Sequence, residues 1–73
     1  MKIKSFWSIF DAEGMIVNQF DVFDTMFQAI DYIKAHYTYK EWFDAELTLN
    51  RFEADVEDNM AIVAFTEQIN PFE

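Results

Sequence analysis

The spacing of the apolar residues along this chain changes from a strand period to a helix period and back again. This pattern constrains the fold more than any other feature of the sequence. Residues 3–10 are rich in aromatic and β-branched side chains, which predicts a strand. Residues 11–14 predict a tight turn in which Gly14 takes a positive φ. Residues 15–21 then predict the return strand of a hairpin.

A helix is predicted to follow the hairpin. Its apolar stripe consists of residues three or four positions apart: Met26, Ile30, Ile33 and Tyr37. Asp24 or Thr25 can cap the N-terminus, and Thr25 with Gln28 has the spacing of a capping box. Lys34 and His36 lie near the C-terminus, where positive charge offsets the helix dipole. Local charge and periodicity therefore agree.

The segment after the helix leaves two alternatives. Thr38 and Glu41 could cap a second short helix over 38–42, or the segment could be a connection. We favour the connection, because a strand-like alternation of apolar and polar residues begins at Phe43 and continues to Asn50. A polar turn is then predicted over 55–59, and a last strand over 60–68.

Together these elements predict an α+β fold in a single domain, residues 1–73. The chain order β-β-α-β-β would give an antiparallel four-stranded sheet with one helix packed on one face. One helix covers only one face, yet the first and last strands carry apolar side chains on both faces. Either loops cover the second face, or an exposed patch marks a contact with a protein partner or a second copy of the chain.

Several kinds of chemistry are excluded by residue type. The chain has no Cys, one His and one Gly, which argues against the usual zinc frameworks and phosphate-binding loops. The lone His36 has no positioned nucleophile, so we expect no enzyme activity. Asp55, Glu57 and Asn59 match the first ligand positions of a calcium loop, but Met60 stands where that loop needs Gly. We expect no catalytic residue, no metal site and no cofactor.

The charge of the chain is strongly one-sided. Fourteen acidic and five basic residues give a net charge of -9. Such a protein is attracted to positive surfaces and repelled by nucleic acid and anionic membranes. No apolar run approaches the roughly 18 residues of a membrane span, and the first residues lack the pattern of a secretory signal. We therefore expect a cytoplasmic protein with a basic protein as its partner.

A dense acidic group occupies residues 53–58. In an extended chain the side chains at every second residue, 53, 55 and 57, would point the same way, about 6.8 Å apart. Such a row of carboxylates would imitate a short run of phosphates. The residues predicted to attract a basic partner are Glu53, Asp55, Glu57 and Asp58, with Asp44 and Glu46 as support on the neighbouring strand. Acidic turns also keep small proteins soluble, but the one-sided excess favours binding.

Aromatic residues cluster over 36–43, after the predicted helix. Tyr39 and Trp42 are predicted to anchor a partner, because Tyr and Trp dominate the energetics of protein interfaces. The alternative is that these side chains close the open end of the core.

In size, charge and lack of catalytic motifs the chain resembles small acidic inhibitors encoded by bacteriophages and mobile elements, which include anti-CRISPR and DNA-mimic proteins. The resemblance covers the overall profile of the chain and no motif. It implies a stoichiometric, non-catalytic inhibitor in the host cytoplasm that occupies the basic nucleic-acid-binding surface of a host defence or transcription enzyme. Two alternatives are an immunity protein or antitoxin that neutralises a basic toxin, and a homo-oligomeric structural or accessory subunit such as a homodimer.

Overall fold

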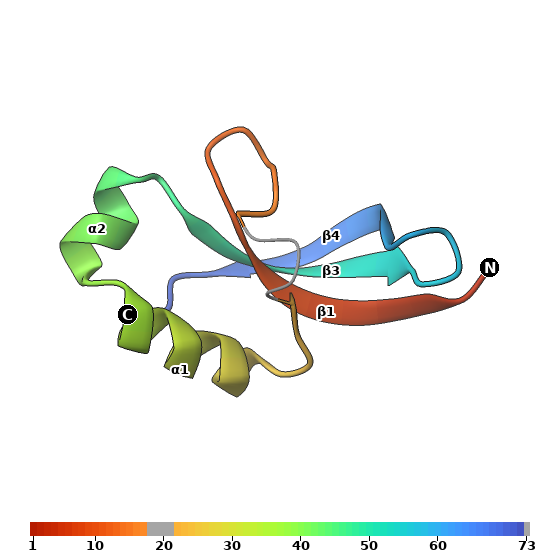
Figure 1. Ribbon diagram of the computed structural model, residues 1–73, viewed down its shortest axis with the longest axis horizontal. Coiled ribbons are helices and arrows are strands. Elements are labelled where there is room, and N and C mark those ends of the chain that lie inside the picture. Colours follow the sequence, from red (N-terminus) through yellow and green to blue (C-terminus); the bar gives the residue numbers. More distant parts are fainter. Residues whose placement is uncertain (18–21, 73) are drawn as a thin grey trace.

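An antiparallel sheet of four strands, in the order β2-β1-β3-β4, forms the centre of the computed structural model (Figure 1). The structure describes residues 1–17 and 22–72. The elements are β1 (Ile3–Phe10), β2 (Val22–Phe23), α1 (Met26–His36), α2 (Tyr39–Asp44), β3 (Thr48–Asp55) and β4 (Ala61–Ile69). The predicted α+β class and antiparallel four-stranded sheet are confirmed. The prediction of one helix is wrong, because α2 follows α1.

The N-terminal hairpin agrees with the sequence only in part. β1 has the predicted bounds, and Gly14 has a φ of 80° in the turn that follows. Of the return strand predicted over 15–21, the described residues 15–17 form a single bridge, between Ile16 and Phe10. The regular pairing with β1 is made by β2, beyond the predicted end. Residues 18–21 lie outside the described residues.

The start of α1 follows from side-chain hydrogen bonds that the sequence predicted. The backbone N–H of Gln28 donates to the Thr25 hydroxyl oxygen at 3.2 Å, so Thr25 is the N-cap. The Gln28 side chain in turn accepts from the backbone N–H of Asp24 at 3.2 Å. The first bond satisfies an N–H group that a helix end otherwise leaves without a partner, whereas the second goes to the residue before the N-cap and not to Thr25, as a capping box would require. α1 then buries Ala29 and Ile33 against the sheet.

Residues 39–44 form α2 instead of the predicted connection and the start of a strand. The Thr38 hydroxyl accepts from the Glu41 N–H at 3.2 Å, and the Glu41 carboxylate accepts from the Thr38 N–H at 2.9 Å. This reciprocal capping box stabilises a helix of only six residues. The alternation that begins at Phe43 therefore lies in α2 and the following loop, and β3 starts at Thr48.

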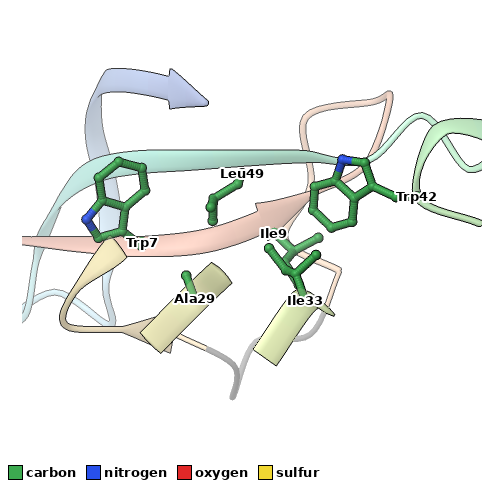
Figure 2. Close-up of a cluster of buried hydrophobic side chains, with 6 residues drawn as sticks. All are labelled: Trp7, Ile9, Ala29, Ile33, Trp42 and Leu49. Carbon is green, nitrogen blue, oxygen red and sulfur yellow. The ribbon is translucent and has the colours of Figure 1, made fainter. Parts of the chain in front are cut away.

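Two hydrophobic clusters lie on opposite faces of the sheet. The cluster on the α1 face consists of Trp7, Ile9, Ala29, Ile33, Trp42 and Leu49 (Figure 2). The cluster on the other face consists of Phe10, Phe52 and Ala54, with Phe6, Ile16, Val22 and Met60 packed against it. The loop 11–17 lies on the side of the sheet away from α1 and brings Ile16 onto this second cluster (Figure 1). A loop thus covers part of the second face, while apolar side chains of β4 stay exposed.

β4 begins and ends one residue later than the strand predicted over 60–68. Met60 belongs to the preceding turn, where Asn59 and Met60 have φ values of 52° and 61°. Neither α1 nor α2, the helices of the described ranges, is long and apolar enough to cross a membrane.

Candidate functional site

An open hollow of about 670 Å³ lies at one end of the molecule, next to α2, the loop that follows it and the end of β4. Trp42 and Phe43 line it with aromatic surface from α2, and Glu46 contributes from the loop. Gln68 and Asn70 line it from the end of β4 and the residue after that strand. Apolar walls with a few polar groups are the usual character of a site that receives a ligand or a partner's side chain.

Exposed aromatic side chains stand beside this hollow. Tyr39 and Phe43 are four residues apart on α2, and their rings stack with centroids 5.9 Å apart and planes 18° apart. They are 56% and 67% exposed, whereas Trp42 is 5% exposed and packs edge-on against Tyr37. Phe72 packs against α2, with its ring centroid 5.9 Å from that of Tyr39 and 6.1 Å from that of Trp42. Of the two predicted anchors, Tyr39 is therefore free to contact a partner, and Trp42 belongs to the core.

Carboxylates surround the same aromatic residues. Asp44 forms an ion pair with Lys40 across one turn of α2. Glu46 follows in the loop at a φ of 55°, a left-handed conformation that non-glycine residues seldom adopt. Among the described residues the Glu46 carboxylate has no hydrogen-bond or ion-pair partner. The pKa of Glu41 is lowered, chiefly by the backbone hydrogen bond from Thr38 and then by the Thr38 side chain, so Glu41 remains charged.

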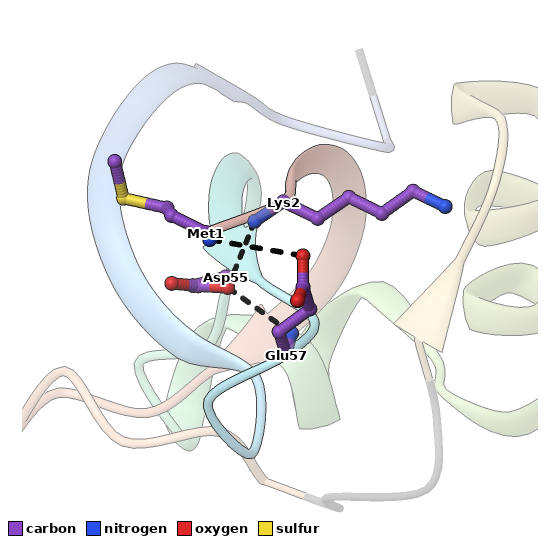
Figure 3. A network of polar contacts seen from close by, with 4 residues as sticks. All are labelled: Met1, Lys2, Asp55 and Glu57. Atoms are coloured by element: carbon purple, nitrogen blue, oxygen red, sulfur yellow. Dashed lines mark hydrogen bonds and ion pairs between the residues drawn. The ribbon is translucent and has the colours of Figure 1, made fainter.

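The other predicted acidic group lies around the turn between β3 and β4 (Figure 3). The Asp55 Oδ1 accepts from the backbone N–H groups of Lys2 at 3.2 Å and Glu57 at 3.1 Å. The Glu57 Oε1 lies 3.7 Å from the amino-terminal nitrogen of Met1. Asp58 is exposed in the turn. Asp55 thus stabilises the turn and the pairing of the N-terminus, in addition to carrying charge.

The predicted row of parallel carboxylates is wrong in its geometry. β3 ends at Asp55, and Glu57 lies in the turn, so Glu57 does not continue the alternation that begins at Glu53. Asp44 and Glu46 do not lie on the polar side of a strand either, because they belong to the end of α2 and its loop. The acidic residues are therefore divided between two places.

These two places are at opposite ends of the molecule (Figure 1). β3 connects them, and its eight residues span about 23 Å from first to last Cα. The structure brings Tyr39, Trp42, Asp44 and Glu46 together at the α2 end. It places Glu53, Asp55, Glu57 and Asp58 at the turn end. One compact interface therefore does not contain all of the predicted residues.

Sequence reasoning missed one exposed aromatic residue. Phe43 was expected to begin a strand, and instead it lies on α2 and is one of the most exposed apolar residues. The sequence signal that could have found it is the capping-box spacing of Thr38 and Glu41, which places Phe43 on a helix. The exposure of β4 was one of the two alternatives left open by the two-sided apolar pattern of residues 60–68.

Within the described ranges, no group of three or more His, Asp or Glu side chains is placed to hold a metal ion. His36 is occupied locally: its Nδ1 lies 2.8 Å from the Tyr32 carbonyl oxygen, and its ring stacks on Tyr32. The α2 end combines exposed aromatic surface with carboxylates.

Comparison with known proteins adds no assignment. No protein family, no curated protein and no solved structure matches this chain. Any function therefore has to be argued from the charge and geometry of the chain itself.

Proposed function

We propose that this protein is a stoichiometric, non-catalytic inhibitor that binds the basic nucleic-acid-binding surface of a host defence or transcription enzyme. The observation that carries the proposal is the α2 end. A hollow, two exposed and stacked aromatic rings and the Glu46 carboxylate, which has no partner among the residues that the structure describes, occur there together. This combination complements a surface that projects Arg or Lys side chains.

Long-range attraction is the first step of the proposed mechanism. The net charge of -9 is almost uncompensated internally, since the described residues form two ion pairs, Met1 with Glu57 and Lys40 with Asp44. Complementary charge accelerates the encounter of two proteins and weakens as salt is added. Glu53, Glu57 and Asp58 contribute to this attraction from the far end of the molecule, outside the contact surface.

Short-range contacts at the α2 end are the second step. A cationic side chain of the partner enters the hollow, where the Glu46 carboxylate pairs with its charge. The faces of Tyr39 and Phe43 add cation–π and apolar contact, which are strongest when water is excluded. Such buried contacts determine the off-rate more than the on-rate. Trp42 supports this surface from within the core.

A capture experiment tests this proposal. Tagged protein is incubated with bacterial lysate at low and high salt, and the captured proteins are identified by mass spectrometry. We expect a basic, nucleic-acid-processing protein that is retained at low salt and released at high salt. Glu46→Lys and Phe43→Ala should each abolish its capture. The matched control is Phe27→Ala, because Phe27 is 73% exposed on α1, away from the hollow.

Two results would contradict the proposal. One is that no cationic protein is captured even in dilute buffer. The other is that Glu46→Lys captures the same protein as the wild type. The identity of the captured protein also separates the alternatives, because an immunity protein or antitoxin would retain a toxin nuclease instead of a defence or transcription enzyme.

A further inference from the structure

β4 is an edge strand whose side chains are exposed on both faces. It pairs with β3 on one side and has no strand on the other side in the described sheet. Residues 61–68 are all exposed, and the large apolar side chains Ile62, Val63 and Phe65 are 40%, 57% and 54% exposed. A long, apolar edge strand that is not blunted by charge is a template for strand addition.

Within the described residues, neither layer of the fold covers the middle of this strand, although Ile69 at its end packs against the α1-face cluster. α1 packs against β1 and β2, which lie two and three positions from β4 in the sheet. On the other face, the apolar residue that the 11–17 loop adds to the second cluster is Ile16. Phe65 touches that cluster, with its ring 5.1 Å from the ring of Phe10, but about half of its surface remains open.

We infer that β4 is the contact surface between two copies of this chain, which associate as an antiparallel, two-fold symmetric dimer. The inference is independent of the proposed inhibitor function, because it concerns a different surface. Two-fold dimers are the commonest closed assemblies, and their contact is made by the same patch on both subunits.

The charge pattern of β4 favours a second copy over a basic partner. Its nine residues include a single ionisable side chain, Glu67, which lies opposite Arg51 in the register with β3. A basic partner would therefore find little to pair with here. If two β4 strands pair antiparallel along their whole length, the pairing is centred on Phe65. Each Phe65 then lies opposite the Phe65 of the other copy, and each Glu67 lies opposite the Val63 of the other copy. The two Glu67 residues are then about 14 Å apart along the strands, beyond the Debye length of about 8 Å.

The size of the molecule sets what the contact has to include. A stable interface usually buries about 800 Å² on each partner, which is about one sixth of the 5030 Å² surface of this chain. Backbone pairing along one edge is too narrow for that area, so the contact has to include side chains on both faces of the strand. Both faces of β4 are open to provide them.

Two features of the sheet oppose growth of the assembly beyond a dimer. One is the irregular pairing of β4 with β3, and the other is the short strand at the opposite edge. β4 has two irregularities in its pairing with β3, next to Val63 and Thr66. The Thr66 hydroxyl donates to the Arg51 carbonyl oxygen at 3.2 Å and so satisfies one backbone group there. Bulges twist an edge and oppose open-ended stacking. Within the described residues the other edge strand, β2, has only two residues, so this part of the chain offers a dimer through β4 no comparable edge from which to grow.

The test is the mass of the purified protein, measured by light scattering after size exclusion over a range of protein concentrations. We expect the wild type to reach the mass of two chains. Val63→Lys and Phe65→Lys should shift it to the mass of one chain. Val63→Lys is the decisive variant, because Phe65 also packs on Phe10 and its loss affects folding. Phe27→Lys is the matched control, since it adds the same charge at a more exposed apolar residue on α1, and it should leave the dimer intact.

Salt distinguishes this inference from the proposed function. Two copies with a charge of -9 each repel one another, so added salt should strengthen the dimer. Binding to a basic partner should weaken under the same change. A single-chain mass at every concentration and salt level would overturn the inference, as would a dimer that survives Val63→Lys with unchanged stability. Neither result bears on capture of a basic protein by the α2 end.

Discussion

β3 and β4 are neighbours in one sheet, yet β4, the more apolar of the two strands, is exposed, whereas most of β3 is buried or half-buried. Cross-strand partners make the contrast plain. Phe52 on β3 is 0% exposed, and Phe65, which lies opposite it on β4, is 54% exposed. Asn50 on β3 is buried, and its partner Gln68 is exposed.

The difference arises from position in the sheet. β3 has β1 on one side and β4 on the other, and it is covered by the two hydrophobic clusters. β4 has only β3 beside it. Apolar residues on a central strand therefore stabilise the fold, whereas the same residue types on the edge are available for contact with another molecule. Matched substitutions at paired positions of β3 and β4 test this difference in burial.

The largest difference is expected at the Phe52–Phe65 pair. Phe52→Ala removes a fully buried ring that contacts Phe6 and Phe10, so it should lower the free energy of unfolding by about 3–5 kcal/mol. Phe65→Ala should cost about 1 kcal/mol, because only part of its ring is buried. Urea denaturation measures the loss of unfolding free energy for both variants. Each variant also carries Val63→Lys, so that dimer formation does not contribute to the measured stability. Equal losses at the two positions would refute the contrast between the strands.

A smaller difference is expected at the polar pair. The Asn50 side-chain N–H donates to the Thr48 hydroxyl oxygen at 2.8 Å in a partly buried position. Asn50→Ala removes this bond and should destabilise the fold by about 1 kcal/mol. Gln68→Ala should change the stability by less than about 0.5 kcal/mol, as is usual at exposed sites. Thermal unfolding of both variants is the measurement, and a larger effect at Gln68 would contradict the assignment of β4 as the exposed strand.

The sequence predicted the elements whose signals are local. β1 was found with its full bounds, because aromatic and β-branched residues fill a single run. α1 was found together with its Thr25 cap, because eleven residues are long enough to show a helical period. α2 was missed, since six residues show almost no period and the alternation from Phe43 to Asn50 resembles a strand. There, the capping box was the more reliable signal.

Strand order and the composition of the site could not be predicted in the same way. The apolar run of β4 suits a buried central strand as well as an exposed edge, and the choice depends on pairing between residues distant in sequence. The sequence assigned Glu46 to the acidic group and Tyr39 to a separate aromatic group, and both lie at the α2 end because they are close along the chain. The grouping of Asp44 with Glu53 was not realised, since it depended on a strand that the structure replaces with α2 and a loop.

The smallest predicted effect concerns the Glu41 carboxylate in the cap of α2, the helix that precedes β3. β3 is preceded by a capped helix, and β4 is preceded by a hydrogen-bonded turn. Hydrogen bonds from Thr38 lower the pKa of Glu41 below its ordinary value of 4.5. A carboxyl group with a lowered pKa in the folded state stabilises the fold above its unfolded pKa, and this contribution is lost as the pH falls through the folded pKa. Glu41 should therefore stabilise the protein at neutral pH and cease to do so at acidic pH.

Glu41→Gln tests this effect, because Gln can still accept the Thr38 hydrogen bond but does not titrate. We expect the variant to melt at a slightly lower temperature than the wild type at neutral pH. The difference should disappear once the pH is below the lowered pKa of Glu41, where the wild-type carboxyl is also uncharged. Glu46→Gln is the control, since the Glu46 carboxylate has no partner within the described residues and its removal should not reproduce that pH-dependent loss. A pH-independent difference for Glu41→Gln would mean that the cap acts through shape alone, without a contribution from charge.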